Sequence, residues 1–78
     1  ELLPLNKNET TAYILHQLNI AGASNNIFNE NAIDAIFNIS NGILRVINNI
    51  ATKALILGTS KKVDTITEEH IFSVSSEL

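Results

Sequence analysis

Residues 40–49, Ser-Asn-Gly-Ile-Leu-Arg-Val-Ile-Asn-Asn, bring together residue types that bind anions. The pattern predicts a helix that ends near Asn41, which tolerates the left-handed backbone of a helix end, then a turn at Gly42 and a long amphipathic helix. Arg45, the only arginine of the chain, falls in the first turn of that helix. Backbone N–H groups are free there and the helix dipole favours an anion, so Arg45 is well placed to meet a phosphate. Because the sequence holds no phosphate-binding loop, this arginine indicates half of a site.

Polar residues continue from Arg45 along the same helix face. Asn48, Asn49 and Thr52 could face a nucleotide or a neighbouring domain, although a solvated helix face has the same composition. Arg45 itself could instead pair with a carboxylate such as that of Asp34. Spacing alone leaves both interpretations open.

The sequence shows no arrangement of residues typical of an autonomous active site. Cys is absent, which excludes disulfides and thiolate metal sites. His16 and His70, the two histidines, lack the spacing of paired metal ligands and are expected at the surface or its boundary. The carboxylates fall in expected helix first turns or on polar faces, with no nucleophile motif beside them. We therefore expect no catalytic residue, no metal site and no enzyme activity in this chain alone.

Length and charge limit the class of protein further. A chain of 78 residues forms one small domain, and its net charge of -3 argues against autonomous nucleic-acid binding. No apolar run reaches about 18 residues and no signal-like N-terminus appears, so no membrane insertion is expected. Together with a first residue that is Glu rather than Met, these features favour an excised segment of a longer protein, expected in the cytoplasm.

Hydrophobic periodicity and capping residues predict an all-α fold, a small four-helix bundle with short connections. The expected helices span about 7–21, 30–40, 43–58 or slightly beyond, and 68–77. Asn6, Asn29 and Thr67 are the expected N-caps, and Asn6 with Glu9 makes a variant of the capping box. Residues 1–5 are interpreted as a connector from a nucleotide-binding core outside the chain, and 6–78 as the helical domain.

Apolar residues at helical spacing give the expected core. They are Ile14, Leu18 and Ala21 in the first helix, Ile33, Ile36 and Phe37 in the second, Ile43, Ile47, Ile50, Ala51 and Ala54 in the third, and Ile71 and Val74 in the fourth. The third helix has the widest apolar stripe, so it is expected at the centre of the bundle, ended by a turn over 58–62.

With these elements placed, the sequence resembles the C-terminal helical lid subdomain of AAA+ ATPases. The resemblance covers almost the whole chain and is strongest over residues 40–49. Other matching positions are Leu3-Pro4-Leu5, Glu9-Thr10, Ala12-Tyr13-Ile14, Leu18, Ala21-Gly22, Ile27-Phe28, Ala32-Ile33, Ala51, Ala54-Leu55 and Glu69-His70-Ile71. The nearest subgroup comprises the bacterial ATPases of the type II secretion assembly (general secretion pathway protein A) and related DNA transposition ATPases.

In that family a Gly-x-Pro-Arg segment carries the sensor 2 arginine, and the resemblance implies this role for Arg45. Arg45 would reach the γ-phosphate of ATP, which a core domain outside this chain would hold together with Mg. Gly42, Asn48 and Asn49 are further candidates to border this nucleotide, and Gly42 has turn geometry as its alternative role. Leu44 stands where the family usually has Pro, a residue that suits the first turn of a helix but is not required there.

The resemblance also implies properties of the longer protein. It would be an ATPase and a homo-oligomer, and this lid would close over ATP and contact the core domain of the same chain. Whether the protein would serve secretion or DNA transposition stays open.

Two other classes of function stay open. The helices over 30–40 and 43–58 could form a helix-turn-helix whose Arg45, Asn48, Asn49 and Thr52 face bases, although one arginine and one lysine make that face weakly basic. The chain could also be a protein-docking module, because Leu44, Leu55 and Ile56 lie outside the expected core.

Overall fold

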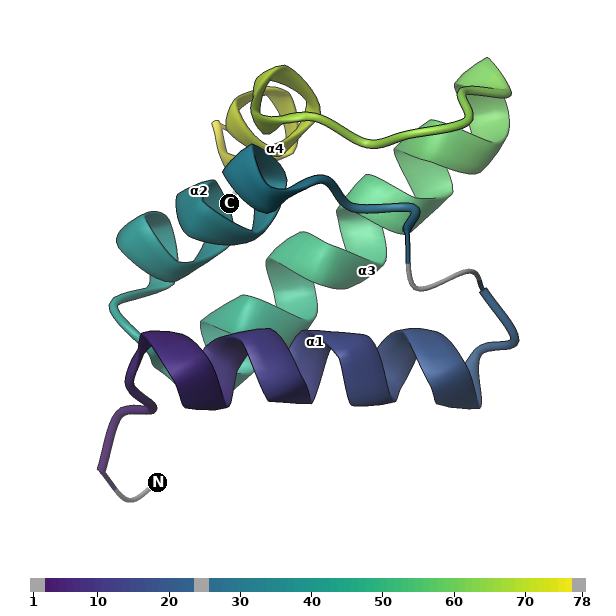
Figure 1. Cartoon of the computed structure of the whole chain (residues 1–78). Coiled ribbons are helices and arrows are strands. Elements are labelled where there is room, and N and C mark those ends of the chain that lie inside the picture. The colour runs from purple at the N-terminus through teal and green to yellow at the C-terminus, as the bar shows by residue number, and fades with distance from the viewer. Residues whose placement is uncertain (1–2, 24–25, 77–78) are drawn as a thin grey trace.

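Four helices follow one another in the computed structural model, which describes residues 3–23 and 26–76 (Figure 1). Their bounds are α1 Lys7–Ile20, α2 Glu30–Ser40, α3 Leu44–Lys61 and α4 Glu68–Ser75. The α2 and α3 helices each contact the other three helices, whereas α1 and α4 lie on opposite sides of the bundle. The predicted all-α bundle is confirmed, and α3 shares its central place with α2.

Side-chain caps begin three of the helices where the sequence places them. The Asn6 carboxamide accepts a hydrogen bond from the backbone N of Glu9 at 2.8 Å, and the Glu9 carboxylate accepts one from the backbone N of Asn6 at 2.9 Å. Asn29 accepts from the backbone N of Ala32 at 2.8 Å. At the start of α4, the backbone N of Thr67 donates to Nδ1 of His70 in the first turn at 3.0 Å. Each cap satisfies N–H groups that a helix start leaves free, so these helix starts are locally encoded.

The end of α3 differs from the sequence prediction. Gly58 lies inside the helix rather than at its end, and Lys62, with φ of 57°, is the C-cap. A Cβ atom at position 58 would lie 3.0 Å from two side-chain carbons of Ile66. Gly58 is therefore a packing site where a fully buried isoleucine approaches α3. The predicted last residue of α4, Glu77, lies outside the described residues.

The core contains most of the predicted residues, with three exceptions. Ala21 is exposed because α1 ends one residue earlier and Ala21 is its C-cap, and Thr10 is buried on the inner face of α1 instead. Phe37 is only half-buried, because Ala32 and Ala35 complete the inner face of α2. Ile43 is also half-buried, because it precedes the first turn of α3 as its N-cap. Small side chains allow α2 to approach its neighbours closely.

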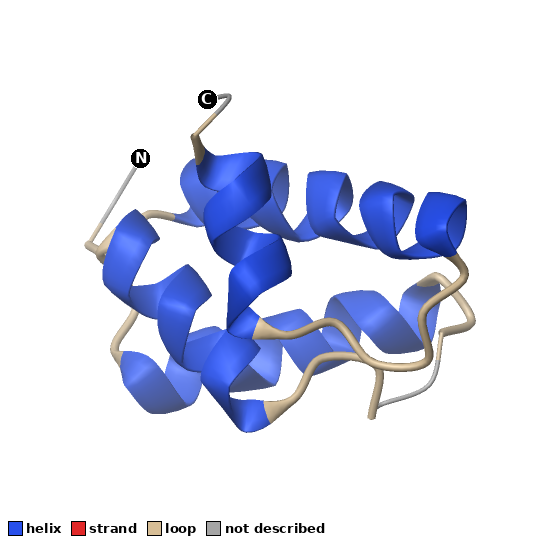
Figure 2. Ribbon diagram, turned by 90° about the horizontal axis from the view of Figure 1, so that it is seen from above, coloured by secondary structure: helices blue, strands red, loops and turns tan. Residues whose placement is uncertain are grey.

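Two loops pair side by side and fix the starts of α2 and α4 (Figure 2). Phe28, in the loop after α1, forms a parallel bridge with Ile66, in the loop after α3. The backbone N of Ile66 donates to the Ile27 carbonyl at 2.5 Å, and the backbone N of Asn29 donates to the Ile66 carbonyl at 3.1 Å. Within residues 3–23 and 26–76, no helix has both the length and the hydropathy needed to cross a bilayer.

Candidate functional site

The turn between α2 and α3 sets the start of the helix that carries Arg45. Asn41 and Gly42 both adopt left-handed backbone conformations, with φ of 54° and 77°, as the sequence predicts for this helix end. The buried Ser40 hydroxyl accepts a hydrogen bond from the backbone N of Gly42 at 3.2 Å and donates to the Phe37 carbonyl at 3.3 Å. Because these polar groups satisfy one another inside the fold, the turn has a defined geometry.

The connector before α1 crosses the same turn. The backbone N of Leu5 donates to the Gly42 carbonyl at 2.8 Å, and a Cβ atom at position 42 would lie only 2.1 Å from the Leu5 carbonyl oxygen. Only glycine allows two backbones to approach this closely. The N–H and the carbonyl of Gly42 are thus both bonded within the chain. Contact between Gly42 and a nucleotide stays a prediction. The geometry supports a role for Gly42 in the turn between α2 and α3.

Arg45 extends from the first turn of α3 into solvent. Asp34, its alternative partner, forms an ion pair with Lys7. Among residues 3–23 and 26–76, the Arg45 guanidinium has no ion-pair or hydrogen-bond partner. All five N–H donors of this side chain are therefore available to a ligand.

The backbone at the start of α3 also suits an anion. Its N-cap residue is Ile43, whose side chain cannot accept a hydrogen bond, whereas α1 and α2 begin with Asn caps. The first turn of α3 contains no acidic residue. A helix start without a side-chain cap leaves its N–H groups and the positive end of its dipole available beside Arg45.

The remaining predicted site residues share one exposed face of α3. Asn48, Asn49 and Thr52 are exposed, opposite the buried Ile47 and Ile50. The structure therefore places them near Arg45 along the helix, as the periodicity indicates, because positions three and four residues apart lie on the same side. Asn48 has an additional contact that the periodicity does not indicate.

A hydrogen bond between two helices holds Asn48. The Tyr13 hydroxyl of α1 donates to Oδ1 of Asn48 at 2.7 Å, across 35 positions of the sequence. Tyr13 is the residue near the site that sequence reasoning missed. Helical spacing describes neighbours within one element, so it carries no signal for a contact between α1 and α3.

A groove between α1 and α3 adjoins this hydrogen bond. Its walls include Gln17 from α1, with Thr52, Leu55 and Ile56 from α3. Leu55 is half-buried and Ile56 is 64% exposed. Leu44, the third residue expected at a docking surface, is half-buried at the other end of α3.

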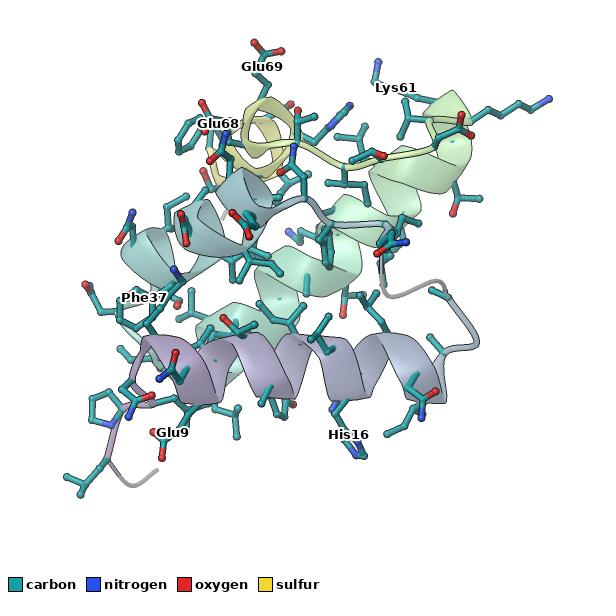
Figure 3. All side chains as sticks on the ribbon, in the orientation of Figure 1. Glu9, His16, Phe37, Lys61, Glu68 and Glu69 are labelled. Carbon is teal, nitrogen blue, oxygen red and sulfur yellow. The ribbon has the colours of Figure 1, made fainter. Side chains whose placement is uncertain are left out.

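Charge is distributed unevenly along the chain. Every Lys and Arg residue except Lys7 lies within 45–62, and this range contains no Asp or Glu. Acidic side chains gather elsewhere, with Glu68 and Glu69 at the start of α4 (Figure 3). In a chain of net charge -3, α3 with its C-cap is therefore the cationic element.

Both histidines lie outside this site. His16 points away from the bundle on α1 (Figure 3) and is exposed. His70 is half-buried in the first turn of α4, and its Nδ1 accepts from the backbone N of Thr67 at 3.0 Å. Surface and boundary positions of this kind are those that the sequence predicts.

Comparison with known proteins gives one informative match. No family model matches the chain, and no solved structure matches it. Over 55 residues, or 70% of its length, the chain is 40% identical to general secretion pathway protein A of Aeromonas hydrophila. The chain spans only 10% of that protein. This similarity supports a relationship between the helical bundle described above and a segment of general secretion pathway protein A.

Proposed function

We propose that this chain is the helical lid subdomain of a AAA+ ATPase. In this proposal, the lid closes over ATP and Mg bound by a core domain of the same longer protein. Closure of such a lid excludes water and completes the binding site, so it couples hydrolysis to movement between subdomains. The catalytic machinery would belong to the core domain, and the lid would supply Arg45.

The observation that carries the proposal is the free guanidinium of Arg45. It extends from an α3 start that has no side-chain cap, and α3 with its C-cap Lys62 holds four of the five Lys and Arg residues. Arg presents a rigid fork of donors that matches phosphate oxygens, so a γ-phosphate is a suitable ligand. The similarity to general secretion pathway protein A supports a secretion-pathway protein as the longer protein, and we propose that it is an ATPase and assembles as a homo-oligomer.

The test compares Arg45→Ala and Ile47→Ala in two assays. The longer protein is assayed for ATP binding and turnover, and the 78-residue chain for thermal unfolding. We expect Arg45→Ala to weaken ATP binding by about 1.5–3 kcal/mol, the usual range for a hydrogen bond to a charged group. The stability of the chain should change by less than about 0.5 kcal/mol, because the side chain is exposed.

Ile47→Ala is the opposite control, because Ile47 is 0% exposed on the buried face of α3. It should cost about 2–5 kcal/mol of folding stability. If Arg45→Ala unfolds the chain, or leaves both ATP binding and turnover unchanged, the arginine does not sense a phosphate.

A further inference from the structure

The hydrogen bond between Tyr13 and Asn48 lies one helical turn from Arg45. Asn48 follows Arg45 by three positions on α3, and residues at this spacing have Cβ atoms about 5–6 Å apart on one side of a helix. Tyr13 is half-buried on α1, so its ring is held by the bundle while its hydroxyl reaches the exposed Asn48. An anchored donor thus meets a side chain that would otherwise rotate in solvent.

This contact determines which end of the Asn48 carboxamide faces outward. The carboxamide has one oxygen acceptor and an NH₂ group with two donors. Because Oδ1 accepts the Tyr13 hydroxyl at 2.7 Å, Nδ2 is turned away from Tyr13. Within residues 3–23 and 26–76, Nδ2 has no acceptor, so its two N–H groups are available in addition to those of Arg45.

We infer that Asn48 is a second phosphate-binding residue and that Tyr13 is its positioning residue. This inference rests on the proposed function of Arg45. Nδ2 of Asn48 donates to the phosphate group that the Arg45 guanidinium contacts, and the Tyr13 hydroxyl holds the carboxamide in the orientation that permits this. A donor held in place before the ligand arrives loses less conformational entropy on binding than a mobile one.

A purely structural role for this hydrogen bond predicts a different behaviour. If the bond only tied α1 to α3, any acceptor at position 48 would serve. Asn48→Asp separates the two cases, because a carboxylate accepts from the Tyr13 hydroxyl but has no N–H donor and repels phosphate. Tyr13→Phe is the complementary variant, since it retains the ring and leaves the Asn48 carboxamide free to rotate.

The experiment measures ATP and ADP dissociation constants in the longer protein that contains this chain. We expect Asn48→Asp and Asn48→Ala each to weaken ATP binding by about tenfold or more, with Asn48→Asp the weaker binder. Tyr13→Phe should weaken ATP binding about threefold. ADP binding should change less in every case, because the proposed contact is with the γ-phosphate. Thermal unfolding should show that Asn48→Asp is as stable as the wild type.

Asn31→Asp is the matched control, since it makes the same chemical change at an exposed site in the first turn of α2. If Asn48→Asp binds ATP as Asn31→Asp does while Arg45→Ala weakens binding, the assignment of Asn48 and Tyr13 is wrong and the lid proposal stands. If Arg45→Ala has no effect, the lid proposal itself fails.

Discussion

Gly22 and Gly42 share one backbone conformation in different surroundings. Their φ angles are 78° and 77°, in the left-handed region that favours glycine. A Cβ atom at Gly22 would meet nothing within 4 Å, whereas one at Gly42 would lie 2.1 Å from the Leu5 carbonyl oxygen. Substituting each glycine in turn therefore separates the free-energy cost of the left-handed conformation from the cost of the close contact with Leu5.

We expect Gly42→Ala to destabilise the chain more than Gly22→Ala. The left-handed conformation should cost each variant about 1–2 kcal/mol. Displacing the connector from the α2–α3 turn should add a further cost of about 1–3 kcal/mol, typical of overpacking, to Gly42→Ala alone. Urea unfolding of both variants measures the difference. Equal destabilisation would contradict the close contact between Leu5 and Gly42.

The shortest helix, α4, depends on the residues at its start. It spans Glu68–Ser75, and the fully buried Ile66 and Ile71 flank its first turn on the inner side. His70 occupies the position where a capping box usually has Glu or Gln, and its Nδ1 accepts from the backbone N of Thr67. An isolated helix of this length is not stable in water, so packing and this cap must maintain it.

The cap makes a prediction about two substitutions of His70. His70→Ala removes the acceptor and should cost about 0.5–2 kcal/mol, the usual effect of losing a helix cap. His70→Glu supplies a carboxylate acceptor at the positive end of the helix dipole, so it should match or exceed the wild type in stability. Thermal unfolding followed by circular dichroism measures both. If His70→Ala is as stable as the wild type, the hydrogen bond from Thr67 to His70 does not stabilise the chain.

Local signals explain why the helix starts could be predicted from the sequence. The Asn6 and Asn29 caps act within three or four residues, so the sequence alone contains them. Contacts between elements were not predictable in this way. From the sequence, Gly58 resembles a helix terminator, and only the structure shows that Ile66 packs against it. Tyr13 likewise resembles an ordinary helix residue, and only the structure shows its hydrogen bond to Asn48. The position of Arg45 was predictable, whereas the hydrogen bond from Tyr13 to its neighbour Asn48 was not.

At the scale of the whole molecule, the basic residues are separated from the acidic ones. The chain has a net charge of -3, yet α3 with its C-cap contains only basic charges. A helix-turn-helix protein would place such a helix in the major groove, and the three-residue connection from α2 to α3 resembles that motif. Binding to DNA depends mainly on neutralising phosphates, however, and this chain has five Lys and Arg residues against eight Asp and Glu residues.

We therefore expect the chain to bind duplex DNA no better than a generic acidic protein. A fluorescence titration at about 50–150 mM salt provides the measurement, since salt strongly weakens phosphate contacts over such a range. Arg45→Ala and Lys53→Ala are the informative variants, because both side chains are exposed on α3. Micromolar affinity that either substitution reduces would favour the helix-turn-helix interpretation over the lid.

The hydrogen bond from Leu5 to Gly42 also limits where the chain can bend. Because this bond ties Leu5 to the α2–α3 turn, a hinge between the lid and the proposed core domain would lie upstream of Leu5, where Leu3 and Pro4 are exposed. Movement about such a hinge would act on the α2–α3 turn at Gly42, the residue that precedes the N-cap of α3. Because Arg45 lies in the first turn of α3, next to this turn, a small rotation upstream would displace its guanidinium relative to the proposed core domain.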